Sequence, residues 1–322
     1  MGDPFPALGF SRTSYASTPS FTGLLATPPW RPWASSTLPR LILGERATAL
    51  LEVCLMVLLV AFAAWLFEAY LSWFALRAWC FKALWVPMIL LAIVLPKRDF
   101  GAYGFSPENP RFTLKWSLVF VAVFILPAAA SIALSEALGA ARQAELSPLG
   151  IVSETVFLMI FVGLIEEAYF RGYAQSRLNE VFEKRWRRLV FKAWKVNYGV
   201  SLPLTSVIFA LLHVVNYWNP ITSRWEPTWW MPVHILGCFA FGCVAGALRE
   251  ASGDVYVPAS LHGSAMTAYT FLSIYANELA LNAGLFISWF FFFLSLARFF
   301  QEAERLKRPA ASPGPSAITR WY

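Results

Sequence analysis

A series of long apolar stretches limits what this chain can fold into more than any other feature of its sequence. About 20 apolar residues in a helix cross the hydrocarbon core of a bilayer. Candidate stretches of this kind follow one another closely, with approximate limits 47–69, 79–96, 113–134, 149–170, 200–217, 229–248, 255–274 and 279–299. They predict an all-α fold, a polytopic transmembrane helical bundle of about eight spans.

The composition agrees with a membrane protein. Of the 322 residues, 58% are hydrophobic and 14% are charged, whereas a soluble domain has about 45–50% apolar and about 25% charged residues. The net charge of +7 does not indicate a nucleic-acid partner, because the basic residues gather in particular loops, as membrane topology requires. The lipid bilayer is therefore the expected environment, and no nucleic-acid partner is expected.

Three regions follow from the positions of the apolar stretches. Residues 1–40 are rich in Pro, Ser and Thr and lack the basic start and apolar core of a signal peptide, so they predict a disordered cytosolic arm. Residues 41–300 hold the transmembrane bundle, and residues 301–322 form a polar C-terminal tail.

The distribution of lysine and arginine predicts the orientation, because cytoplasmic loops carry the excess of these residues. One side of the bundle receives the basic groups Lys97, Arg98 and Arg111; Lys184, Arg185, Arg187, Arg188, Lys192 and Lys195; and Arg305, Lys307 and Arg308. The opposite loops hold mainly Arg142 and Arg224. Both termini are therefore expected in the cytoplasm, in a multi-pass protein that we assign to the bacterial inner membrane.

Two adjacent carboxylates, Glu166 and Glu167, stand with Arg171 at the end of the fourth apolar stretch. A charged group in a membrane helix costs about 2.5–3.5 kcal/mol on insertion scales, so it rarely lies there without a reason. Glu167 and Arg171 are spaced i, i+4 and are expected to form an ion pair, which could simply anchor a helix end. Glu166 points about 100° away and needs another partner, for which a histidine from another helix is the natural candidate.

The chain has three histidines, and each of them, taken alone, could be a hydrogen-bonded packing residue. His213 ends the fifth stretch, and His262 precedes Gly263 and Ser264, small residues that allow another helix to approach. His234 has no motif around it and is expected to be structural. The cysteines Cys54, Cys80, Cys238 and Cys243 form no CxxC pair and imply no disulfide framework; Cys238 and Cys243 are interpreted as packing residues.

Taken together, these groups indicate chemistry inside the bilayer. Glu166 beside His213 could take a proton from water and make hydroxide for attack on an amide carbonyl; a positioned general base contributes about 10²–10⁴-fold. A second histidine could stabilise the oxyanion, often worth about 10²–10³-fold. The trio Glu166, His213 and His262 could instead ligate zinc and leave a position for water. Spacing alone does not separate these alternatives, and the sequence holds neither HExxH nor GxSxG.

Three motifs in order make the chain similar to a known family. Glu166 to Arg171 matches EExxxR, Phe209 to His213 matches FxxxH, and a glycine-rich stretch precedes His262. This order over residues 150–275 resembles the CAAX prenyl protease 2 and bacteriocin-processing (CPBP) family of intramembrane endopeptidases.

The resemblance implies roles for these residues and a site that opens toward the cytoplasm. Glu166 and His213 would activate the catalytic water, His262 would help to hold the oxyanion, and Glu167 and Arg171 would shape the site. It leaves the cofactor open: zinc on Glu166, His213 and His262, or a metal-free glutamate mechanism. The implied partner is a peptide or membrane-protein substrate, which need not be prenylated.

One position departs from the family pattern. The third motif is HxxxN or HxxxD, and here the residue four after His262 is Met266, a weak acceptor that cannot donate a hydrogen bond. Either Thr267, Ser264 or a water takes the role, or oxyanion stabilisation is weaker. Besides an endopeptidase of CAAX-protease type, a non-catalytic membrane scaffold or immunity protein on the same fold fits the sequence. A proton-coupled transporter fits less well, because no internal repeat is evident.

Overall fold

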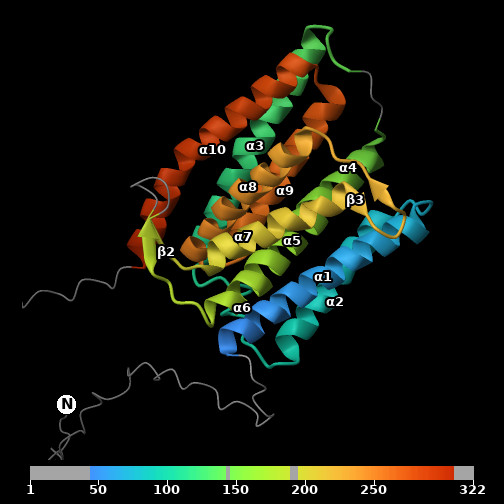
Figure 1. The fold of residues 1–322 in the computed structure, drawn as a ribbon. Coiled ribbons are helices and arrows are strands. Elements are labelled where there is room, and N and C mark those ends of the chain that lie inside the picture. Colours follow the sequence, from blue (N-terminus) through green and yellow to red (C-terminus); the bar gives the residue numbers. More distant parts are fainter. Residues whose placement is uncertain (1–43, 143–145, 189–194, 308–322) are drawn as a thin grey trace, which may run out of the picture. The chain divides into compact units, whose positions relative to one another are not determined.

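The computed structural model describes residues 44–142, 146–188 and 195–307, and in these ranges the chain is a bundle of helices with two short hairpins (Figure 1). The helices are α1 (Glu45–Leu71), α2 (Arg77–Val94), α3 (Pro110–Ala137), α7 (Ser201–Leu212), α8 (Trp230–Ser252), α9 (Tyr256–Tyr275) and α10 (Glu278–Leu306). A further continuous helix, Pro148–Asn179, lies between α3 and α7 in the chain. The all-α fold class predicted from the sequence is confirmed.

Every predicted apolar stretch forms a helix, but fewer of these helices meet the criteria for a membrane span. Within the described ranges, six are long and apolar enough: α1, α2, α3, the Pro148–Asn179 helix, α8 and α10. The stretch 200–217 forms the shorter apolar helix Ser201–Asn216, which consists of α7 and the 3₁₀ turn η3 (His213–Asn216). Helix α9 is the other exception, because polar residues such as His262, Ser264 and Thr267 interrupt its apolar sequence.

The starts of three helices are fixed by local sequence signals. Asn109, Ser147 and Asn277 each accept a hydrogen bond from the backbone N–H three residues later, at the N-termini of α3, α4 (Pro148–Val156, the first part of the Pro148–Asn179 helix) and α10. Such side chains satisfy a backbone donor that has no partner within the helix. Gly253 ends α8 with a φ of +82°, in the left-handed region that favours glycine at a helix end.

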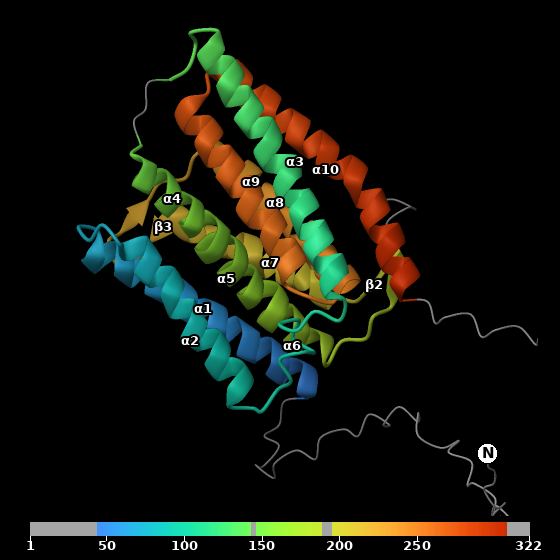
Figure 2. The ribbon, with the colours of Figure 1, turned by 180° about the vertical axis from the view of Figure 1, so that it is seen from behind.

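Two groups of side chains form the core, on either side of the Pro148–Asn179 helix. Helices α3, α9 and α10 lie together (Figure 2), and aromatic residues such as Phe120 and Phe292 pack edge-to-face between them, with ring centroids 5.2 Å apart. Helices α1 and α2 lie side by side on the other side, where Trp85 of α2 packs on Tyr169 at 5.1 Å. The residues around Glu166 therefore lie between two packed layers.

Glycines allow the helices around Glu166 to cross closely. A Cβ on Gly163 would lie 2.8 Å from backbone atoms of Ala259 and Gly263 on α9, and a Cβ on Gly263 would lie 2.9 Å from Cα of Met159. This close crossing agrees with the expectation that Gly263 lets another helix approach. It brings the helix turn that carries His262 against the turn that carries Glu167.

The Pro148–Asn179 helix continues nine residues beyond the predicted limit at 170. The polar residues Arg171, Gln175 and Arg177 end the apolar pattern, yet tertiary contacts keep this segment helical. Gln175 donates to the Gly246 carbonyl at 3.2 Å and to Glu250 at 2.8 Å, and Arg177 donates to Glu52 at 2.8 Å. Glu166 consequently lies in the interior of a long helix and not at its end.

The remaining loops contain the two hairpins. The basic loop after the Pro148–Asn179 helix forms β1 (Trp186–Arg188) paired with β2 (Lys195–Tyr198), and β3 (Trp218–Asn219) pairs with β4 (Arg224–Trp225). Helix α10 runs to Leu306, past the predicted limit at 299. The predicted arm 1–40, and the predicted tail from residue 308 onward, lie outside the described residues.

Candidate active site

The two adjacent glutamates lie between two π-helical segments of the Pro148–Asn179 helix. This helix is α4 (Pro148–Val156), then η1 (Phe157–Leu164), α5 (Ile165–Glu167), η2 (Ala168–Ala174) and α6 (Gln175–Asn179). Segments η1 and η2 are π-helical. This conformation is rare in proteins overall, and where it occurs it often lies at a functional site. Helix α2 packs on one side of α5 and α9 on the other (Figure 2).

Glu167 is the centre of a fully buried ion pair. Its side chain and that of Arg171 are both 0% exposed, with Arg171 Nε 3.1 Å from Glu167 Oε2. The predicted i, i+4 pairing is therefore present, but it lies inside the protein and does not anchor a helix end at the interface. The hydrogen-bonding partner of His262 is also Glu167, whose Oε1 lies 2.9 Å from His262 Nδ1. Because a carboxylate accepts, His262 Nδ1 carries a proton.

Glu166 forms an ion pair with Lys82, which reaches it from α2. The Lys82 ammonium also lies 4.2 Å from the ring centroid of Trp85. Glu166 is close enough to His213 and His262 to interact with both electrostatically. Lys82 is a residue of this site that we did not predict; its signal in the sequence is a lysine within an apolar stretch, which calls for a partner.

His213 stands where α7 passes into η3, and its ring is oriented by the backbone of its own helix. Its Nδ1 lies 2.9 Å from the carbonyl oxygen of Phe209. A carbonyl oxygen can only accept, so Nδ1 carries the proton and Nε2 of the neutral ring keeps a free lone pair. The FxxxH spacing thus supplies, one turn before the histidine, the carbonyl that selects its tautomer.

Three of the predicted site residues, one from each motif, lie around the buried ring of Phe209. The ring centroid lies 4.7 Å from that of His213 and 6.1 Å from that of His262. The guanidinium of Arg171 lies 5.1 Å from the same centroid. The structure therefore brings the three motifs of the sequence to one place, from the Pro148–Asn179 helix, α7 and α9.

A second group, unpredicted from the sequence, adjoins His213. The rings of His213 and His234 are 5.4 Å apart, and His234 Nδ1 lies 2.9 Å from the hydroxyl of Tyr217. In the part of the chain that the structure describes, one ligand atom from each of His213, His234 and Cys238 lies within 4.8 Å of the others. The sequence signal was the i, i+4 spacing of His234 and Cys238. Zinc ligation by Glu166, His213 and His262 stays a prediction.

The hydroxyls near Met266 are engaged by backbone carbonyls. Thr267 Oγ1 donates to the Gly263 carbonyl at 2.7 Å, and Ser264 Oγ donates to the Ser260 carbonyl at 2.6 Å. Ser264 also faces the Phe120 carbonyl of α3, at 3.4 Å. These contacts do not favour either hydroxyl as the substitute for the family Asn or Asp.

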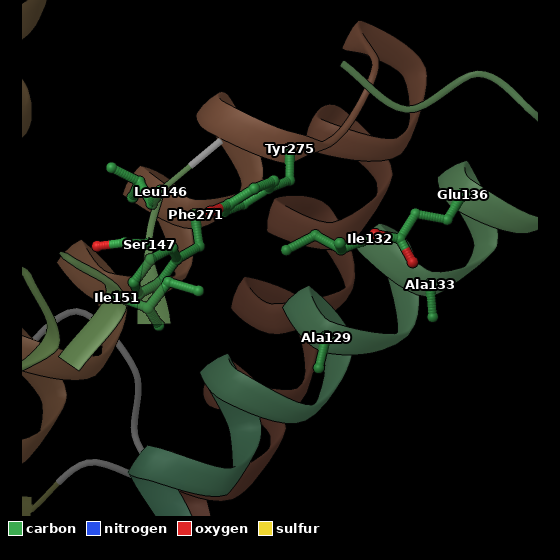
Figure 3. A pocket seen from close by; sticks show the side chains of 9 residues that line it. All are labelled: Ala129, Ile132, Ala133, Glu136, Leu146, Ser147, Ile151, Phe271 and Tyr275. Atoms are coloured by element: carbon green, nitrogen blue, oxygen red, sulfur yellow. The ribbon is translucent and has the colours of Figure 1, made fainter. Parts of the chain in front are cut away.

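A cavity of about 840 Å³ lies apart from these groups, between α3, α9 and the start of α4 (Figure 3). It is lined mainly by apolar side chains: Ala129, Ile132, Ala133, Glu136, Leu146, Ser147, Ile151, Phe271 and Tyr275. None of the predicted site residues is among them.

The fold and these groups define a class: a multi-pass integral membrane protein in which carboxylates and histidines from several helices form a buried site. Residues 148–268 match the family model of the type II CAAX prenyl endopeptidase Rce1-like proteins. The match agrees with the resemblance of residues 150–275 to the CPBP family, and all five predicted catalytic residues lie within the matched segment. No curated protein and no solved structure matched the chain.

Proposed function

We propose that this protein is an intramembrane endopeptidase that hydrolyses a peptide bond near the cytoplasmic membrane face with a water activated by Glu166 and His213. The observation that carries the proposal is the state of His213. Its Nδ1 is held by the Phe209 carbonyl, so Nε2 is left as a proton acceptor close to a buried carboxylate.

The two groups divide the work on the water. Lys82 engages Oε1 of Glu166, so Oε2 remains as an acceptor for one water hydrogen while His213 Nε2 accepts the other. The water oxygen forms a bond to the substrate carbonyl carbon, its proton passes to the Glu166–His213 pair, and the carbonyl electrons move to the oxygen. Collapse of this intermediate breaks the C–N bond, and the proton passes to the departing amine.

His262 and Glu167 supply the oxyanion partner. When His262 is protonated, Nδ1–H donates to Glu167 and Nε2–H is free to donate to the developing oxyanion. The adjacent carboxylate stabilises the imidazolium, and Arg171 neutralises the same carboxylate. Preorganised donors of this kind are often the largest single contribution to catalysis.

The charges of the site balance before reaction. Lys82 pairs with Glu166, and Arg171 pairs with Glu167. Buried charges are tolerated when they are paired in this way. With neutral histidines the cluster carries no net charge, and the positive charge that His262 gains on protonation then offsets the charge of the developing oxyanion.

Zinc on Glu166, His213 and His262 is the alternative form of this proposal. In that form the ion would lower the pKa of a bound water. The donors are chemically suitable, but Lys82 and Glu167 already engage Glu166 and His262. The mechanism above therefore routes no step through a metal.

The orientation is part of the proposal. The basic loop with β1 and β2 follows α6, and the loop after α2 holds Arg98, which pairs with Glu52 of α1 at 2.5 Å. The positive-inside rule places these loops in the cytoplasm. Both termini would lie on that side, in a bacterial inner membrane.

A cleavage assay with purified protein in detergent tests the function. The probes are a quenched-fluorescence farnesylated CAAX peptide, its unprenylated counterpart and the products of the neighbouring genes, with new termini identified by mass spectrometry. Glu154→Gln, on the same helix but outside the site, is the control for Glu166→Gln. We expect cleavage of at least one probe, retained by the control and reduced by at least about 10²-fold in Glu166→Gln.

A non-catalytic membrane scaffold or immunity protein is the second candidate function, and Met266 is the observation that favours it. It predicts that no probe is cleaved, or that Glu166→Gln and the control behave alike.

A further inference from the structure

We propose that His213, His234 and Cys238 form a binding site for a thiophilic transition-metal ion, with zinc as the expected occupant, and that metal bound there inhibits cleavage. The proposal that a metal ion binds there rests only on the geometry of these three residues. The inhibition rests on the proposed function, because it requires His213 to take part in catalysis.

The three side chains come from two elements that pack together. His213 lies at the junction of α7 and η3, while His234 and Cys238 lie one turn apart on α8, where i, i+4 side chains share a face. Their ligand atoms lie within 4.8 Å of one another. Tetrahedral zinc with nitrogen and sulfur ligands requires ligand atoms about 3.4–3.6 Å apart, from the usual bond lengths. Small rotations of half-buried side chains close that difference.

The second nitrogen of each histidine is already fixed, as in built metal sites. His213 Nδ1–H donates to the Phe209 carbonyl, and His234 Nδ1 lies 2.9 Å from the Tyr217 hydroxyl, which can accept its proton. Metal-ligating histidines nearly always donate their other N–H to an oxygen of this kind, which fixes the tautomer and the ring orientation. Nε2 of both rings is therefore the nitrogen available for a metal.

The donor set selects the type of ion. Two imidazoles and a thiolate suit zinc or copper and do not suit calcium or magnesium, which prefer oxygen ligands. Glu166 is close enough to both His213 and Cys238 to interact with them electrostatically. A nearby carboxylate favours a bound cation, and three protein ligands leave a fourth position for water.

Metal at this site would remove the base from the reaction. The lone pair of His213 Nε2 cannot bind a metal and accept a proton from water at the same time. Zinc on the alternative set Glu166, His213 and His262 would instead support hydrolysis. Whether zinc inhibits or activates cleavage therefore shows which of the two sets of ligands binds it.

Cobalt binding tests the site without any substrate. Chelator-treated protein in detergent is titrated with Co²⁺, and the thiolate-to-cobalt charge-transfer absorption is recorded. Cys243→Ser, which removes a thiol from the same helix but outside the group, is the matched control. We expect the absorption in the unmodified protein and in Cys243→Ser, its loss in Cys238→Ser, and an affinity weakened by at least about tenfold in His234→Ala. Equal absorption in Cys238→Ser and Cys243→Ser would overturn the site.

Zinc titration of cleavage tests the inhibition. Zinc should inhibit the unmodified protein, whereas His234→Ala and Cys238→Ser should keep their basal cleavage and need at least about tenfold more zinc for the same inhibition. Activation by zinc, or unchanged inhibition in both variants, contradicts the inhibitory role. If no probe is cleaved, the proposed function fails, while the cobalt result still decides the metal site.

Discussion

The Pro148–Asn179 helix contributes residues to two carboxylate clusters, and the two differ in how many of their hydrogen-bonding groups are already occupied. Glu52 of α1 accepts from Arg98 at 2.5 and 2.9 Å, from Arg177 at 2.8 Å and from the Tyr173 hydroxyl at 3.0 Å. Glu166 and Glu167 each have one cationic partner and lie beside histidines whose Nε2 atoms stay available. Both clusters pair carboxylates with cationic side chains, so the available proton acceptor is what distinguishes the candidate catalytic cluster.

The largest expected effect concerns Glu166 and His213 acting as a unit. Glu166→Gln and His213→Ala should each reduce kcat by about 10²–10⁴-fold, because each removes part of the general base. The double variant should be no slower than the slower single variant, since residues that act together are strongly non-additive. Steady-state kinetics on a cleaved probe measure this, and additive losses would show that the two residues act separately.

The next effect concerns stability in the buried pair of Glu167 and Arg171. Arg171→Met leaves a buried carboxylate without its cation and should lower the free energy of unfolding by about 3–5 kcal/mol. The control is Arg185→Met in the exposed pair with Glu183, where the nitrogen–oxygen distance is also 3.1 Å. That loss should be about 0–1 kcal/mol. Denaturant unfolding in detergent compares them, and equal losses would refute the contrast.

A substitution at Met266 is expected to have a smaller effect, and this effect is an increase in kcat. Met266→Asn places an amide one turn after His262 and should raise kcat by about tenfold, less than the usual value of a preorganised oxyanion donor, with little change in KM. Thr267→Val is the control, because the Thr267 hydroxyl already donates to the Gly263 carbonyl. Unchanged kcat in Met266→Asn together with a clear loss in Thr267→Val would assign the role to Thr267.

The smallest effect lies in the loop between α2 and α3. Burial, with a hydrogen bond of 2.6 Å to Glu180, raises the pKa of Tyr103. A phenol with a raised pKa in the folded state stabilises the fold below its unfolded pKa of about 10, and the stabilisation is lost as pH rises above that value. Tyr103→Phe should cost about 1 kcal/mol at neutral pH and weaken the alkaline loss of stability. An unchanged alkaline profile would contradict this assignment.

The sequence predicted the helices because they depend on local pattern, whereas the roles of the motif residues stay a prediction. Apolar stretches marked the helices, and the FxxxH spacing placed a carbonyl beside His213. The partner of His262 was beyond such reasoning, because segments η1 and η2 alter the helical phase around Glu166 and Glu167. An angle of about 100° per residue then no longer determines which carboxylate faces α9.

Partners from distant helices were also missed. Lys82 lies 84 residues from Glu166, and the proximity of His234 to His213 depends on how α8 packs against α7. Gly242 and Gly246 set that packing, since a Cβ on Gly242 would lie 3.0 Å from Ser206 and one on Gly246 would lie 3.0 Å from Leu202. Sequence spacing within one helix contains no information on such contacts between helices.

The most direct test compares Glu166→Gln with Glu52→Gln for both cleavage rate and unfolding midpoint. The account predicts that Glu166→Gln loses at least about 10²-fold in kcat, while Glu52→Gln lowers the midpoint and keeps a near-normal kcat per folded molecule. The double variant Lys82→Met with Glu166→Gln removes both buried charges and should be equally inactive with its fold intact. Normal cleavage in Glu166→Gln, or an equal loss of kcat in Glu52→Gln, would contradict the account.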